Sequence, residues 1–90
     1  MTAELVELLE KLLPESRKSI RVLALFLENP KEAYTKYMVE KLTATNKVGV
    51  VLERFRELNI LEVVDEEPRA YRLNLRNPLV RSLLRLVEHT

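Results

Sequence analysis

The segment LERFRELNILEVVDEEPRAYRLNL, residues 52–75, changes its periodicity twice and constrains the fold more than any other part of the chain. It begins with apolar residues at helical spacing, and after Asn59 the runs ILEVV and AYRLNL alternate as strands do. DEEP separates the two runs, and its Pro68 cannot donate to a strand ladder. The sequence therefore predicts a β-hairpin placed directly after a helix.

The helix before this hairpin is predicted to bury one stripe of side chains. The stripe has helical spacing and consists of Val48, Leu52, Phe55 and Leu58, with Val51 alongside. The opposite, solvated face consists of Lys47, Gly49, Val50, Glu53, Arg54 and Glu57. Asn59 follows at the position where a helix end needs a left-handed residue, which Asn tolerates.

Other helices are predicted on both sides of this unit. Leucines at helical spacing indicate a first helix that Pro14 ends; they are Leu5, Leu8, Leu9, Leu12 and Leu13. Residues 20–27 are apolar on almost every side, which is typical of a central helix, and Ser16 can cap it. Asn77 and Pro78 fit the N-cap and first position of a last helix, on which Arg81 and Arg85 are exposed.

A short helix from Lys36 to about Leu42 is predicted between the central helix and the turn. Thr35 is its expected N-cap, with Tyr34 and Val39 placed as a hydrophobic staple. We expect Met38, Val39 and Leu42 to point inward. Thr45 or Asn46, in the polar turn that follows, is expected to cap the next helix.

Length and composition limit the class of protein. Ninety residues, 47% of them apolar and 32% charged, suit one domain. The expected class is mainly α with a small β-hairpin (α+β), arranged as an N-terminal helix (1–15), a core (16–75) and a C-terminal helix (76–90). No apolar run is long enough to span a membrane, and the acidic N-terminus is unlike a signal peptide, so we expect a soluble, cytoplasmic protein without membrane contact.

The sequence gives little support for catalysis or for a bound cofactor. There is no cysteine, and the single histidine, His89, is next to last, where nothing would hold a general base in place. No glycine-rich phosphate loop and no metal-ligand spacing is present. We therefore expect no enzyme activity, metal, cofactor or small-molecule effector. The surplus of Glu, Lys and Arg and the lack of Cys and Gln favour a thermophilic, archaeal source.

The order of predicted elements resembles the winged helix-turn-helix transcription regulators of the MarR and ArsR kind. The resemblance covers residues 16–75 and is carried by SIRVLALFLENP, YTKYMVEKLTA, the spacing VxxxLxxFxxLNIL and the closing EVVDEEPRAYRLNL. It implies a sequence-specific protein that inserts the helix at about 46–58 into the major groove of double-stranded DNA, with the hairpin as its wing. A regulator of transcription is the expected role.

Candidate DNA-binding residues follow from that architecture and from the chemistry of their side chains. Asn and Arg can bond base edges, cations neutralise phosphates, a glycine permits close approach, and helix N-termini offer backbone N–H groups. The candidates are Thr35, Lys36, Thr45, Asn46, Lys47, Gly49, Val50, Arg54, Arg69 and Arg72, with Arg17, Lys18, Arg21 and Lys41 as further cations. The alternatives are that Lys47 and Arg54 pair with glutamates and that Arg72 pairs with Glu62.

The wing tip carries Asp65, Glu66 and Glu67, which DNA would repel. We therefore expect the tip to point away from DNA, with Arg69 or Arg72 making the wing contact. A protein-interaction module without DNA binding is the alternative function, because an acidic wing and the exposed Val50 suit a protein partner.

The terminal helices predict a homodimer. Their apolar residues exceed what a small core absorbs, and in the resembled families such helices form the dimer interface. The candidate interface residues are Leu5, Leu9, Leu12, Leu83, Leu84 and Val87, with Glu4, Glu7 and Glu10 facing Arg81 and Arg85. A twofold dimer would present two helices to half-sites roughly 34 Å apart. The alternative is that both helices only cover the core of the monomer.

Overall fold

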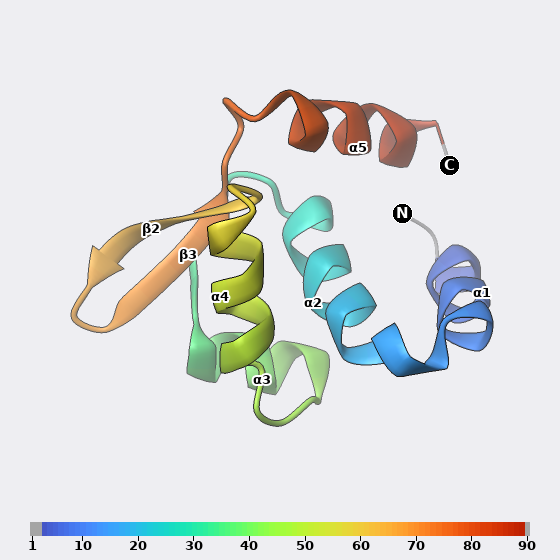
Figure 1. The fold of residues 1–90 in the computed structure, drawn as a ribbon, viewed down its shortest axis with the longest axis horizontal. Coiled ribbons are helices and arrows are strands. Elements are labelled where there is room, and N and C mark those ends of the chain that lie inside the picture. Colours follow the sequence, from blue (N-terminus) through green and yellow to red (C-terminus); the bar gives the residue numbers. More distant parts are fainter. Residues whose placement is uncertain (1–2, 90) are drawn as a thin grey trace.

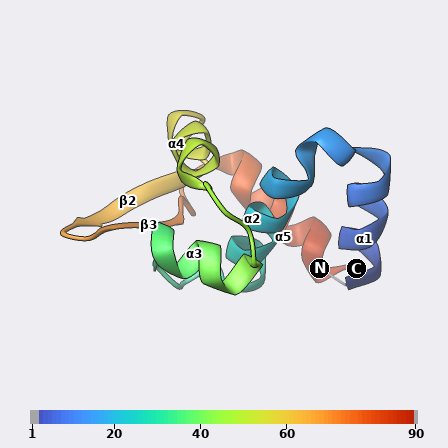
Figure 2. The same ribbon diagram turned by 90° about the horizontal axis from the view of Figure 1, so that it is seen from below.

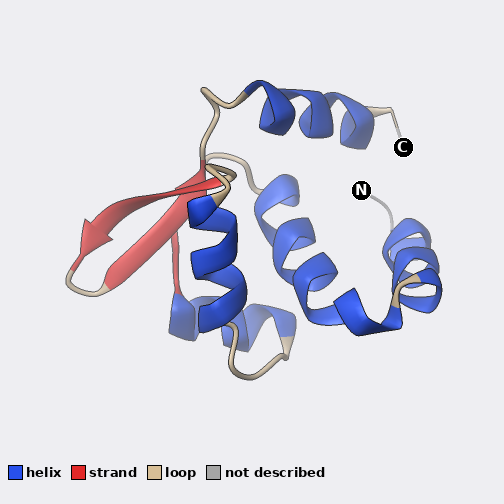
Figure 3. Cartoon of the chain, viewed as in Figure 1, coloured by secondary structure: helices blue, strands red, loops and turns tan. Residues whose placement is uncertain are grey.

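The computed structural model describes residues 3–89, so Met1, Thr2 and Thr90, the ends of the predicted terminal segments, lie outside it. The elements are α1 (Ala3–Leu12), a 3₁₀ turn η1 (Pro14–Ser16), α2 (Arg17–Glu28), β1 (Tyr34–Thr35), α3 (Lys36–Thr43), α4 (Gly49–Glu57), β2 (Leu61–Glu66), β3 (Arg69–Leu73) and α5 (Pro78–Glu88). The chain is mainly helical with one small sheet, which confirms the α+β class (Figure 1, Figure 3). No helix among the described residues is long and apolar enough to cross a membrane.

Two of the predicted helix starts are confirmed, and a third lacks its capping bond. The Met38 N–H donates to the Thr35 hydroxyl at 3.3 Å, and the Leu79 N–H donates to the Asn77 side chain at 2.9 Å. Ser16 occupies the N-cap position of α2, but its side chain makes no capping hydrogen bond there. The turn η1 leads directly into α2, so the first turn of α2 begins from an already helical segment.

The end of α4 is fixed by the left-handed residue that the sequence predicts. Asn59 has φ 61°. Its N–H donates to the Arg56 carbonyl at 3.0 Å, and the Ile60 N–H donates to the Phe55 carbonyl at 2.9 Å. This pair of bonds is the Schellman pattern, and it turns the chain from α4 into β2.

The sheet contains one strand more than the sequence predicts. Its order is β1-β3-β2, all antiparallel, and β1 joins it through the pairs Tyr34↔Tyr71 and Thr35↔Ala70. A two-residue strand leaves no alternating pattern to detect. The strands lie nearer the tip of the hairpin than ILEVV and AYRLNL imply. β2 includes Asp65 and Glu66 but not Ile60, and β3 begins at Arg69 and ends at Leu73, so only residues 67–68 form the turn.

The core lies between α2, the inner face of α4 and the sheet, as expected for a central α2. Its fully buried side chains include Val22, Phe26, Leu52, Leu61 and Leu73. Phe26 and Tyr34 meet edge-to-face with ring centroids 5.4 Å apart. α1 and α5 both pack on α2, while the hairpin extends from the opposite end of the molecule, beside α4 (Figure 1, Figure 2).

Three residues that were expected to point inward are exposed. On α3, Met38 and Leu42 are 41% and 58% exposed, and Val39 alone is buried. Thr43 lies one turn after Val39 on the same helix face and is partly buried, so α3 is rotated by one residue from the predicted orientation. Leu58, 58% exposed, is the residue at which α4 ends, and the turn into β2 removes it from the stripe.

Candidate nucleic-acid interface

The outer face of α4 is open to solvent. Val50 is 69% exposed and Arg54 is exposed, whereas Val51, Leu52 and Phe55 bury the other side. Among residues 3–89 no ion pair joins Lys36, Lys47 or Arg54 to a carboxylate. The expected alternative, in which Lys47 and Arg54 pair with glutamates, is therefore wrong for this part of the chain.

The starts of α3 and α4 share one basic surface. A Cβ atom added to Gly49 would lie 3.7 Å from Lys36 Cε and 3.8 Å from Lys36 Nζ. The Lys36 side chain thus crosses the first turn of α4, and its ammonium group lies beside the exposed helix face. Thr35, the cap of α3, immediately precedes it.

The turn between α3 and α4 differs from the predicted one. Ala44 and Lys47 both have left-handed backbones, with φ 53° and 57°. Glu40 accepts hydrogen bonds from the Lys47 N–H at 2.7 Å and the Val48 N–H at 3.4 Å. α4 consequently begins at Gly49, and the prediction that Thr45 or Asn46 caps it is wrong.

Glu40 fixes the turn before α4, a role that the sequence did not reveal. Its carboxylate accepts hydrogen bonds from the backbone N–H groups just before α4. The sequence predicted a helix start at Thr45 whose N–H groups would bind a DNA phosphate instead. The Thr45 hydroxyl itself donates to the Thr43 carbonyl at 3.1 Å. A cap supplied by the preceding helix leaves no local spacing signal, because a capping box involves residues three apart.

The two candidate arginines of the hairpin have different surroundings. Arg72 donates to Glu62 at 3.3 Å, as the cross-strand alternative predicted, and Arg76 lies 3.8 Å from the same carboxylate. Arg69 is 42% exposed and lies over the Tyr71 ring at 5.7 Å. Arg72 is equally exposed, but Arg69 lies 3.6 Å from its carboxylate partner, Glu53, without a hydrogen bond, so it is the less closely held of the two.

Glu53 joins α4 to the hairpin. The Tyr71 hydroxyl donates to one of its carboxylate oxygens, Arg56 Nε donates to the other at 2.9 Å, and Arg69 lies 3.6 Å away. The hydrogen bond from Tyr71, followed by that from Arg56, lowers the pKa of Glu53. Burial, together with Glu53, raises the pKa of Tyr71 to about 12.

These residues surround a hollow of about 750 Å³ between α4 and β3. Its lining consists of Gly49, Val50, Glu53, Arg54, Glu57, Arg69 and Tyr71. Four of the ten predicted DNA-binding residues therefore meet here: Gly49, Val50, Arg54 and Arg69. Asn46 lines a separate surface hollow with Tyr37, Glu40 and Lys41.

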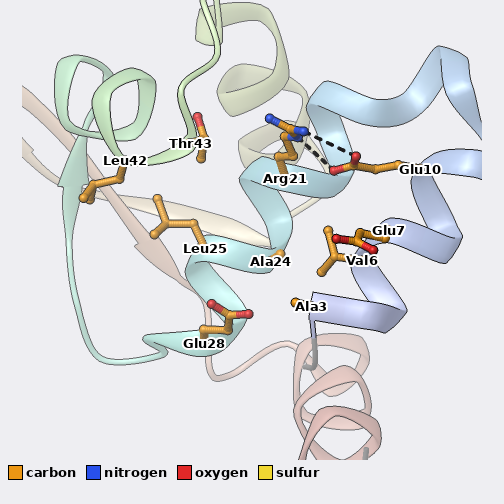
Figure 4. Close-up of a pocket in the computed structure, with 10 residues that line it drawn as sticks. All are labelled: Ala3, Val6, Glu7, Glu10, Arg21, Ala24, Leu25, Glu28, Leu42 and Thr43. Carbon is orange, nitrogen blue, oxygen red and sulfur yellow. Dashed lines mark hydrogen bonds and ion pairs between the residues drawn. The ribbon is translucent and has the colours of Figure 1, made fainter.

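The basic residues at the start of α2 do not all belong to this surface. Arg21 Nε donates to Glu10 at 2.8 Å (Figure 4). Arg17 lies 3.8 Å from the same carboxylate. The prediction that Arg21 is available for phosphates is therefore wrong, because Arg21 ties α2 to α1. The same hydrogen bond lowers the pKa of Glu10, which is paired within the chain instead of facing Arg81 or Arg85.

The predicted dimer residues are divided between the interior and the surface of one chain. An entirely apolar cavity of about 210 Å³ lies between α1, α2 and α5, and its lining includes Leu5, Leu9, Leu83 and Val87. Leu84 packs against the core, whereas Leu12 is 66% exposed. Covering of the core by the terminal helices thus accounts for part of the apolar surplus.

Within residues 3–89 no group of three or more His, Cys, Asp or Glu side chains could hold a metal ion. Comparison with known proteins finds no matching family model, no matching curated protein and no matching solved structure.

Proposed function

We propose that residues 17–73 form a winged helix-turn-helix that binds double-stranded DNA. In this arrangement α3, the turn at 44–48 and α4 are the helix-turn-helix, β2 and β3 are the wing, and α4 enters the major groove. The element order supports it, since the helices, the turn and the hairpin follow one another as the resemblance to MarR- and ArsR-like regulators implies.

The observation that carries the proposal is the exposed face of α4. Arg54 lies on this face, the Lys36 side chain crosses its first turn, and Lys47 lies two residues before its start. None of the three side chains forms an ion pair with a carboxylate among the described residues, and Arg69 lies across the adjoining hollow. A helix of this kind, with cations at its start and a hairpin at its side, matches the requirements for groove insertion and phosphate neutralisation. A regulator of transcription that acts as a homodimer is the role that this resemblance favours.

The test is duplex binding by a variant with Lys47→Ala and Arg54→Ala. We expect the affinity for DNA to fall and the salt dependence of log K to become shallower by about 0.9 for each phosphate that the variant no longer neutralises. The matched control is Arg81→Ala with Arg85→Ala, which removes the same charge from exposed positions on α5. If wild-type protein binds no duplex at low salt, or if both double variants lose equal affinity, the proposal is wrong.

One observation favours a second candidate, a protein-interaction module. Val50 is 69% exposed, and the wing tip carries three exposed carboxylates. For such a module the substitutions at Lys47 and Arg54 would have little effect, and Val50→Asp would abolish capture of the protein partner.

A further inference from the structure

One of the residues that line the proposed DNA surface is a carboxylate, Glu53. Glu53 projects from α4 into the hollow between Arg54 and Arg69, with its side chain 35% exposed. An ionised carboxylate there would repel DNA phosphates. Its position therefore needs a physical reason.

The surroundings of Glu53 supply that reason. Its two oxygens each receive one close hydrogen bond, from Arg56 within α4 and from Tyr71 on β3. Arg69 is the third partner, at 3.6 Å and without a hydrogen bond to Glu53. Arg69 is therefore the most weakly held of the three partners and can leave while the carboxylate keeps both hydrogen bonds.

We propose that Glu53 is a positioning residue of the DNA surface, which holds Arg69 beside α4 in the free protein and releases it to a phosphate when DNA binds. This inference rests on the proposed function. Tyr71 and Arg56 keep Glu53 in place throughout, so the angle between the wing and α4 does not depend on Arg69. The lowered pKa of Glu53 is consistent with a carboxylate that stays ionised in both states.

The same geometry distinguishes Arg69 from Arg72. Arg72 donates a hydrogen bond to Glu62, which also lies near Arg76. The Arg69 and Arg72 side chains are equally exposed, at 42%, but Arg69 makes no hydrogen bond to its carboxylate partner and lies over the Tyr71 ring, at the edge of the hollow. Arg69 is accordingly the wing cation that a phosphate can reach by replacing one weak contact.

The experiment compares Glu53→Gln with Glu57→Gln, a matched control. Both substitutions remove one negative charge from α4, and both residues line the hollow, but only Glu53 contacts Arg69. Binding to random-sequence duplex DNA is measured at several salt concentrations, with thermal melting to show that each variant is folded. We expect Glu53→Gln to bind about two- to fivefold more tightly than Glu57→Gln, the affinity equivalent of one exposed ion pair.

The comparison is repeated in the Arg69→Gln background, where the difference between the two variants should vanish. Equal affinities in the original background would overturn the role of Glu53 and leave DNA binding intact. If the two variants still differ in DNA affinity in the Arg69→Gln background, the proposal is also wrong, because the difference would then come from Arg56 or from the overall electrostatic potential of the protein. Absence of duplex binding by wild-type protein and by Glu57→Gln would refute the proposed function, and this inference with it.

Discussion

Ala44 carries a backbone conformation that its side chain disfavours. With φ 53° and ψ 39° it is left-handed, which costs an L-residue about 1–2 kcal/mol. The conformation allows its N–H to bond the Glu40 carbonyl and end α3. The turn that leads into α4 therefore contains an exposed residue, Ala44, whose backbone conformation is unfavourable.

We expect Ala44→Gly to stabilise the protein by about 0.5–1 kcal/mol. Glycine removes the free-energy cost of the left-handed conformation. Its greater flexibility in the unfolded chain lowers the stability by roughly 0.4–1 kcal/mol, which is the smaller of the two effects. Denaturant unfolding measures the change. Ala33→Gly is the control, because Ala33 has no positive φ, and it should destabilise by roughly 0.4–1 kcal/mol. A loss of stability in Ala44→Gly would contradict this account of the turn.

Residues whose role is set by their immediate neighbours were predictable. Thr35 and Asn77 cap helices that begin directly after them, and Asn59 ends a helix that lies directly before it. Glu40 could not be predicted, since its hydrogen bonds to the N–H groups of Lys47 and Val48 depend on how the intervening turn closes. The pairing of Arg21 with Glu10 has the same origin, because it requires α1 to fold back on α2.

At the scale of elements, hydrophobic spacing predicted α2, α4 and the hairpin, whose apolar sides face a core. For α3 it predicted a buried face that is one residue away from the observed one, because the pair Met38 and Leu42 and the pair Val39 and Thr43 both have helical spacing. Only packing against α2 decides between these two faces, and it selects Val39. The strand β1 was missed because its partner, β3, begins 34 residues after β1 ends (35 to 69).

The junction between the hairpin and α4 predicts a pH-dependent effect of Tyr71→Phe. Loss of the hydrogen bond to Glu53 should destabilise the protein by about 1 kcal/mol near neutral pH. Because the folded pKa of Glu53 lies below its ordinary value of 4.5, the stabilisation is present above pH 4.5 and is lost as the pH falls through the lower, folded pKa. The difference between wild type and variant should thus shrink under acid conditions.

The alkaline side gives an independent measurement on the same pair. The folded pKa of Tyr71 is raised from 10.0 to about 12, so its contribution is complete below pH 10.0 and is lost as the pH rises through about 12. Phenolate absorbance should show one tyrosine titrating near 12 that is missing in Tyr71→Phe. A stability difference that stays constant across the whole pH range would refute the coupling.

At the scale of the whole molecule, the exposed leucines of α1 and α5 are the remaining candidates for an interface between two chains. Leu12 is 66% exposed and Leu86 is 65% exposed. If these helices form the proposed dimer, Leu12→Asp should shift sedimentation from dimer to monomer at micromolar concentration. The melting of the single chain should change little, because the side chain is mostly in solvent.

Leu42→Asp is the control for that experiment, since Leu42 is similarly exposed, at 58%, but lies on α3. It should leave the sedimentation of the protein unchanged. A wild-type protein that sediments as a monomer would show instead that the terminal helices serve only to cover the core.

The pairing of β1 with β3 also has a consequence for the rate of folding. Most elements contact a neighbour in sequence, whereas Tyr34↔Tyr71 encloses α3, α4 and β2 in a single loop. Closing such a loop costs chain entropy before its contacts form. We expect the helices and the hairpin to form early and β1 to join late, so that substitutions at Tyr34 mainly accelerate unfolding and leave the folding rate nearly unchanged.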